Sequence, residues 1–189
     1  MVEKAQSAAA FFRECLSRAL RSRRVETSEL VEAYLVQLLT DLTGLRRSVL
    51  GPDRRTLVDM LREANEARGA DKARLYREIG DSALVGSGVY REWLLHQGMS
   101  LSYYETVGGS AYRQAGHLHR ALRASPIDEL CLELGAKFVG LADALDAAAT
   151  LGVESSDSGL VRLLDRFQRS GRPWMRGILL RSGLDPDLN

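Results

Sequence analysis

The side chains that could titrate, ligate a metal or stack on a ligand gather in one stretch of this chain. All three histidines and four of the six tyrosines lie between Tyr90 and His119, together with Trp93 and the Gly108-Gly109 pair. Such side chains are sparse elsewhere. We therefore expect any ligand or chemistry to be found near residues 90–123.

The histidine spacing argues against a metal centre. Glu92 and His96 lie one helical turn apart but supply only two ligands, which favours a surface hydrogen bond. His117 and His119 differ by roughly 200° at helical pitch and point to opposite faces. They could converge only if the helix ended near Gly116. The sequence therefore predicts no metal site and implies no cofactor.

The tyrosines also point to different faces of the helix. Tyr103 and Tyr104 diverge on a helix, whereas Tyr104, Tyr112 and His119 share one side. A pocket would use the hydroxyl groups, with Glu105, Arg113 or His119 as acid or base, but core packing is the favoured interpretation. The candidate pocket residues are Tyr103, Tyr104, Tyr112 and His119.

Common catalytic and nucleotide-binding motifs are missing. Gly86-Ser87-Gly88 lacks the third glycine and the preceding strand of a dinucleotide fingerprint, and no phosphate-binding GxxxxGK[ST] occurs. No serine sits in a GxSxG elbow. The sequence therefore contains no motif that specifies a reaction.

Composition indicates a globular protein of 189 residues with a net charge of +1. No apolar run approaches 18 residues and the start of the chain does not resemble a signal peptide, so we expect no membrane segment. Cys15 and Cys131 belong to no CxxC pair and lie at apolar helix positions. We expect buried thiols in a reducing cytoplasm.

Charge is unevenly distributed along the chain. Seven acids and one base lie between Asp128 and Asp157, and six arginines and one acid lie between Arg162 and Arg181. The favoured interpretation is solvated helix faces of opposite sign that neutralise each other. The alternative is an anion-binding surface for a nucleic acid or an acidic protein, and the near-neutral total argues against tight nucleic-acid binding. Its candidate residues are Arg162, Arg166, Arg169 and Arg176.

Apolar residues recur at three- and four-residue spacing throughout, which predicts an all-α fold. We expect one domain, residues 1–189, formed by a bundle of seven or eight amphipathic helices, with a flexible connection near 152–158 and a polar tail at 184–189. Thr27 or Ser28 can cap the second helix and Ser100 or Ser102 a later one. The expected helices cover 5–24, 28–42, 53–68, 71–94 with a break near 86–88, 100–123, 126–152, 160–167 and 173–179.

Glycines occur inside several of these helices, each at a cost of roughly 0.8–1 kcal/mol relative to alanine. Their number predicts that helix backbones approach closely. The alternative is space for a ligand, or a kink, beside Gly108-Gly109. The interior glycines are Gly80, Gly108, Gly109, Gly116, Gly135 and Gly140.

These observations favour a non-catalytic, cytoplasmic helical module that binds a protein partner or itself through an exposed helix face. The alternative is a helical small-molecule or cofactor-binding protein, which could be an enzyme, with its pocket near residues 90–123.

Overall fold

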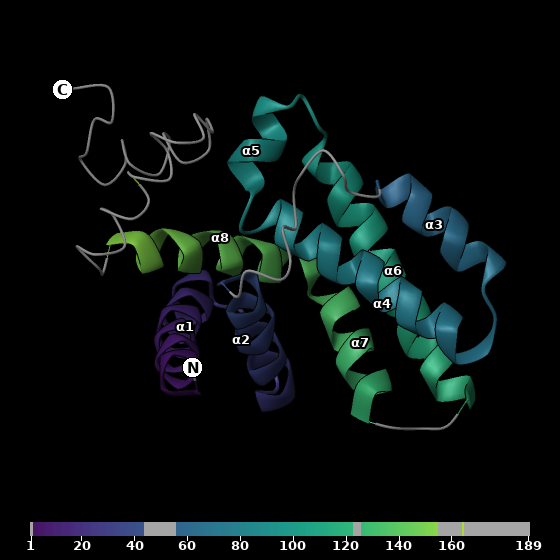
Figure 1. The fold of residues 1–189 in the computed structure, drawn as a ribbon, viewed down its shortest axis with the longest axis horizontal. Helices are drawn as coiled ribbons and strands as arrows, with labels where there is room; N and C mark the ends of the chain where they lie inside the picture. Colours follow the sequence, from purple (N-terminus) through teal and green to yellow (C-terminus); the bar gives the residue numbers. More distant parts are fainter. Residues whose placement is uncertain (1, 44–55, 123–125, 155–163, 165–189) are drawn as a thin grey trace.

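A computed structural model describes residues 2–43, 56–122, 126–154 and 164. Over these residues the chain forms eight helices and no strand, which confirms the all-α prediction (Figure 1). The helices expected at 160–167 and 173–179 lie outside the described residues, apart from residue 164. The helices are α1 Val2–Arg23, α2 Glu29–Thr43, α3 Leu57–Glu66, α4 Gly69–Ser87, α5 Arg91–His96, α6 Leu101–Leu122, α7 Pro126–Ala136 and α8 Phe138–Glu154.

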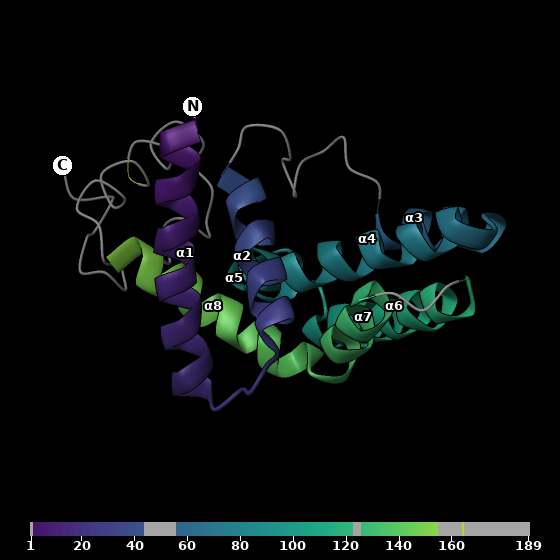
Figure 2. The ribbon, with the colours of Figure 1, turned by 90° about the horizontal axis from the view of Figure 1, so that it is seen from below.

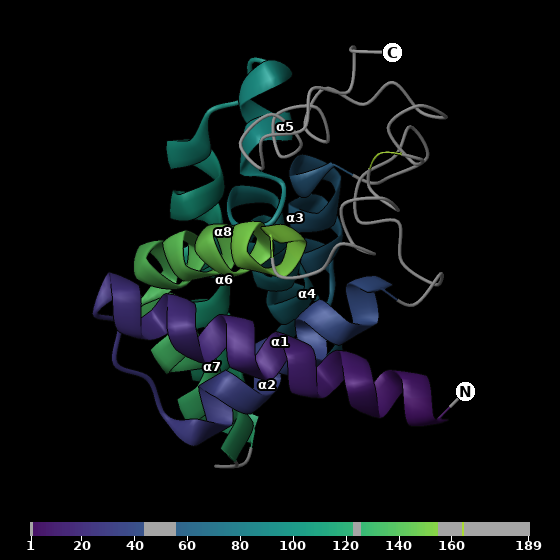
Figure 3. The same cartoon turned by 90° about the vertical axis from the view of Figure 1, so that its left-hand side faces the viewer.

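The helices pack in two groups. α4 packs on α6, with α3 beside α4 and α7 beside α6, so that these four helices form two layers (Figure 2). α1 and α2 lie side by side, and α8 packs against α1, above it in the view of Figure 3. α8 also contacts α4 and α6, so its buried apolar residues join the two groups into one core.

Short polar side chains start several helices as expected. Ser28 Oγ accepts a hydrogen bond from the Val31 backbone N–H, and Ser100 Oγ accepts one from Tyr103. The third helix was expected from residue 53 but begins at Leu57, because Thr56 and Asp59 form a reciprocal capping box. Residues 53–55 lie outside the described residues.

The prediction of one helix over 126–152 is wrong, since the structure divides it into α7 and α8 at Lys137. The Gly135 carbonyl, near the end of α7, accepts a hydrogen bond from Arg113 Nη1 of α6 at 3.0 Å. Lys137 Nζ donates to the backbone carbonyl of Glu26, between α1 and α2, at 2.6 Å. Hydrogen bonds to partners distant in sequence thus favour a break at Lys137 over one continuous helix.

Another expectation about boundaries also fails. The third helix was expected to reach residue 68 and the next to begin at 71, but α3 ends at Glu66 and α4 begins at Gly69, which has a φ of +55°. A positive φ is easily adopted by glycine, so Gly69 allows the chain to turn sharply between the two helices. The expected break near Gly86-Ser87-Gly88 is confirmed, because α4 ends at Ser87 and α5 follows.

Close helix packing at glycines is confirmed. A Cβ on Gly80 would lie 2.6 Å from the ring of Tyr112, and one on Gly116 would lie 2.7 Å from the side chain of Leu132. Gly109 differs, because its Cβ would meet Gly135 O and Phe138 Cβ at 3.4 Å, an ordinary contact distance. Gly80 and Gly116 are therefore required by packing, whereas Gly109 is not.

Both cysteines are free and buried, as expected. Burial raises the pKa of the Cys131 thiol to about 11. The thiol is therefore protonated at neutral pH and packs as a small apolar group. Over the residues the structure describes, no helix is both long and apolar enough to cross a bilayer.

We expect Gly80→Ala to destabilise the protein by about 1–3 kcal/mol, because the added methyl group overlaps the Tyr112 ring. Gly109→Ala is the matched control. It should be neutral or raise stability by up to about 1 kcal/mol, since alanine favours the helix and meets no clash. Urea unfolding followed by circular dichroism measures both. Equal effects of the two substitutions would contradict the packing assigned to Gly80.

Candidate binding groove

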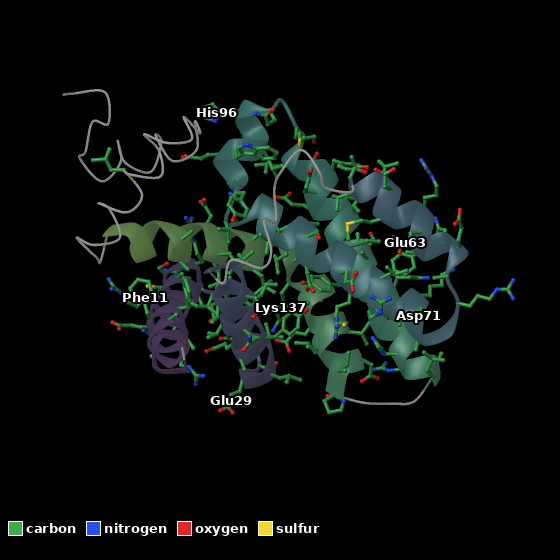
Figure 4. The ribbon with its side chains drawn as sticks, in the orientation of Figure 1. Phe11, Glu29, Glu63, Asp71, His96 and Lys137 are labelled. Atoms are coloured by element: carbon green, nitrogen blue, oxygen red, sulfur yellow. The ribbon has the colours of Figure 1, made fainter. Side chains whose placement is uncertain are left out.

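A groove of about 550 Å³ lies where α6 meets the α7–α8 junction and the connection between α1 and α2. In Figure 4 the labelled Lys137 lies between α2 and α7, at this meeting point. The groove is open along one side, and three separate segments of the chain form its walls. Its lining residues are Arg24, Val25, Glu26, Glu105, Gly109, Arg113, Gly135, Ala136, Lys137, Phe138, Val139 and Gly140.

One wall is a stripe along α6. Glu105, Gly109 and Arg113 follow at four-residue spacing and all line the groove. Arg113 is fixed in place, because Nη1 donates to Gly135 O at 3.0 Å and Nη2 donates to Ser110 Oγ at 3.2 Å. The stripe therefore carries a carboxylate, a buried glycine and a guanidinium that hydrogen bonds hold in place.

The opposite wall is tied together by Lys137. Its Nζ donates to Glu26 O and, at 2.9 Å, to Glu133 Oε1, which also accepts the Ser28 backbone N–H at 2.9 Å. Burial acts to raise the pKa of Glu133, but hydrogen bonds from Ser28 and Lys137 outweigh it and hold that pKa below its usual value. The wall thus joins α7 to the start of α2.

Apolar atoms lie between these charges. Phe138 is buried and Val25 is partly buried, whereas Val139 is 52% exposed. Exposure of half of a valine side chain costs part of its transfer free energy, so a partner that covered it would gain by binding. The groove therefore combines an apolar surface with charged rims.

The four predicted pocket residues lie elsewhere. None of them lines this groove, and their environments differ. Tyr103 is 41% exposed, Tyr112 is fully buried, and Tyr104 and His119 are partly buried. Tyr104 lies against Gly86 of α4 and Tyr112 against Gly80 of the same helix, so both use the face of α6 that packs on α4.

Tyr112 belongs to a polar cluster between three helices. Its hydroxyl group and that of Tyr34 each donate to Oδ1 of Asp81 at 2.6 Å. Burial raises the pKa of Asp81, although both tyrosine hydrogen bonds and the nearby Arg77 oppose the shift. Burial likewise raises the pKa of both tyrosines, so they remain protonated donors. The cluster connects α2, α4 and α6.

The histidines occupy three different environments. His117 is exposed, and His96 Nδ1 lies 2.7 Å from the backbone carbonyl of Glu92. Burial, reinforced by Arg77, lowers the pKa of His119, so this imidazole is neutral at pH 7. Its buried Nε2 has no hydrogen-bond partner in the described structure. Among the described residues, no three histidine, cysteine or acidic side chains are grouped to hold a metal ion.

The candidate anion surface, Arg162, Arg166, Arg169 and Arg176, lies outside the described residues. Acidic side chains of α7 and α8 form ion pairs with arginines of other helices. Arg120 pairs with Asp128 at 3.0 Å, and Arg91 pairs with Asp143 at 2.5 Å. These pairs connect α6 to α7 and the start of α5 to α8.

The sequence predicts a tyrosine-lined pocket with Glu105, Arg113 or His119 as acid or base, and space for a ligand beside Gly108-Gly109 as the alternative to close packing. Glu105, Gly109 and Arg113 line the groove, but the tyrosines and His119 do not. The sequence does not indicate Arg24, Glu26 or Lys137, because no local pattern brings three distant segments together. The four-residue spacing of Glu105, Gly109 and Arg113 was the available signal.

No protein-family model, curated protein or solved structure matches this chain.

We expect Asp81→Leu to destabilise the fold by about 1–3 kcal/mol for each tyrosine hydroxyl left without an acceptor. Asp81→Asn, which keeps an acceptor oxygen, is the control and should lose less. Urea unfolding measures both variants, and equal losses would contradict the hydrogen-bonding role.

A pH dependence is expected when the wild type is compared with Asp81→Asn. The raised pKa means that the folded protein holds the Asp81 proton more tightly than the unfolded chain does. This contribution to stability is present below the ordinary pKa and is lost as the pH rises through the raised pKa. As the pH rises from the ordinary pKa of an aspartate to the raised pKa of Asp81, the free energy of unfolding of the wild type should therefore fall relative to that of Asp81→Asn. A difference that rises with pH would contradict the assigned direction.

Proposed function

We propose that this protein is a non-catalytic helical interaction module that binds a segment of a partner protein in the groove. The observation that carries the proposal is the groove itself, which presents apolar side chains between charged rims beside Gly109. The two free, buried thiols support a reducing compartment such as the cytoplasm as its place of action.

The lining residues favour recognition over catalysis. The lining set contains no histidine, cysteine, serine, threonine or tyrosine, so it offers no hydroxyl, thiol or imidazole group for nucleophilic catalysis. Its acid–base groups are two glutamates, a lysine and two arginines. Arg113 and Lys137 are engaged by neighbouring carbonyls and carboxylates, which holds the walls in place before a partner arrives. A preorganised surface of this kind loses little entropy on binding.

The volume of about 550 Å³ also falls within the range of small-molecule pockets. Such pockets usually enclose most of the ligand surface, whereas this groove is open along one side. An open groove suits a chain segment that enters and leaves at its ends. A small molecule remains the second candidate for its occupant.

Peptides selected from a random library on the immobilised full-length protein would test the proposal, with affinity then measured by fluorescence anisotropy. Gly109→Leu should weaken the selected peptides at least tenfold, because the new side chain extends into the groove. Its Cβ meets only ordinary contacts, but the position is buried. Val139→Asp, at a lining residue that is 52% exposed, is therefore the second variant and should weaken the same peptides if the leucine variant folds poorly.

Thr106→Leu is the matched control. It adds a similar apolar side chain at an exposed position of α6 outside the groove lining and should leave affinity unchanged. Failure to select any peptide, or equal binding by both variants, would reject the groove as a peptide site.

A further inference from the structure

The groove carries charges of both signs in a defined order along α6. Glu105 lies one turn before Gly109 and Arg113 lies one turn after it, on the same face. At a rise of 1.5 Å per residue, the backbones of Glu105 and Arg113 are roughly 12 Å apart. Gly109 lies midway between them and is buried against Gly135 and Phe138.

These charges are not neutralised by partners within the described structure. Glu105 forms no hydrogen bond or ion pair there. Arg113 donates only to a carbonyl and a hydroxyl oxygen, both uncharged acceptors. Lys137 differs, because Glu133 pairs with it at 2.9 Å. A carboxylate and a guanidinium on the α6 stripe are therefore open to charges on an occupant.

We propose that the groove binds an extended peptide segment that carries one acidic and one basic residue separated by four positions. An extended chain advances about 3.3 Å per residue, so residues i and i+4 are separated by roughly the distance from Glu105 to Arg113. They also point to the same side of the strand, as does residue i+2 between them. The basic residue faces Glu105, the acidic residue faces Arg113, and an apolar residue at i+2 lies in the groove between them.

Charge complementarity favours this segment over one of a single sign. A purely acidic peptide would meet Glu105, and a purely basic peptide would meet Arg113, each as a like charge on the stripe. This inference rests on the proposed function and adds the chemistry of the partner to it. It also predicts that affinity falls as salt is added, since the charged rims are exposed to solvent.

Labelled nine-residue peptides of one apolar pattern would test the inference on the full chain by fluorescence anisotropy. One set carries the acidic and basic residues four positions apart in both chain orders, and the others carry two acids or two bases. In at least one chain order, the mixed peptide should bind the wild type at least tenfold more tightly than either single-sign peptide.

Glu105→Lys should reverse this preference. The substituted stripe is basic at both ends, so the mixed peptide should weaken and the two-acid peptide should gain at least tenfold. Glu66→Lys, at an exposed position of α3 outside the groove lining, is the charge-matched control and should change nothing. Glu105→Gln, which only removes the charge, gives a milder version of the test if the lysine variant folds poorly.

The peptide site and its preference for a mixed-charge segment can be rejected separately. Peptides that bind and are weakened by Gly109→Leu, yet are indifferent to peptide charge and to Glu105→Lys, would overturn the mixed-charge segment and leave the interaction module standing. If no peptide binds, or if Gly109→Leu weakens none of the peptides that bind, both proposals are overturned.

Discussion

The contact between Tyr112 and Gly80 is the constraint on which the rest of the structure depends. Since Gly80 has no side chain, the Tyr112 ring can lie directly on α4 and its hydroxyl group can reach Asp81, the next residue along that helix. Tyr34 of α2 donates to the same carboxylate oxygen. A single apolar contact and a shared hydrogen-bond acceptor therefore set the spacing and rotation of α6 relative to its neighbours.

This rotation determines what the rest of α6 can present. With Tyr112 turned into α4, the stripe of Glu105, Gly109 and Arg113 faces the α7–α8 junction and the groove. Arg113 then bonds Gly135 O near the end of α7, and the chain continues as a separate helix beyond Lys137. The break at Lys137 belongs to one wall of the groove, and it depends on Arg113, a side chain of the opposite wall. α6 therefore uses one face to pack into the core and another to form the candidate binding surface.

Much of the fold could be predicted because its signals are local. Apolar periodicity located the described helices, and Ser28 and Ser100 cap two of them as expected. Buried thiols followed from the apolar positions of both cysteines. The break at Lys137 could not be predicted, because the partners that hold it, Arg113 and Glu26, lie more than 20 residues away in sequence.

By itself, the sequence determined the helical class, the positions of most helix ends and the shared face of Tyr104 and Tyr112, since each follows from rotation and capping along a single helix. It also singled out Glu105, Arg113 and the glycines beside them. Only the tertiary structure decided that Tyr112 enters the core while Glu105 and Arg113 line a groove with Arg24, Glu26 and Lys137. The physical reason is that a groove forms between segments, and its shape depends on how closely their backbones pack.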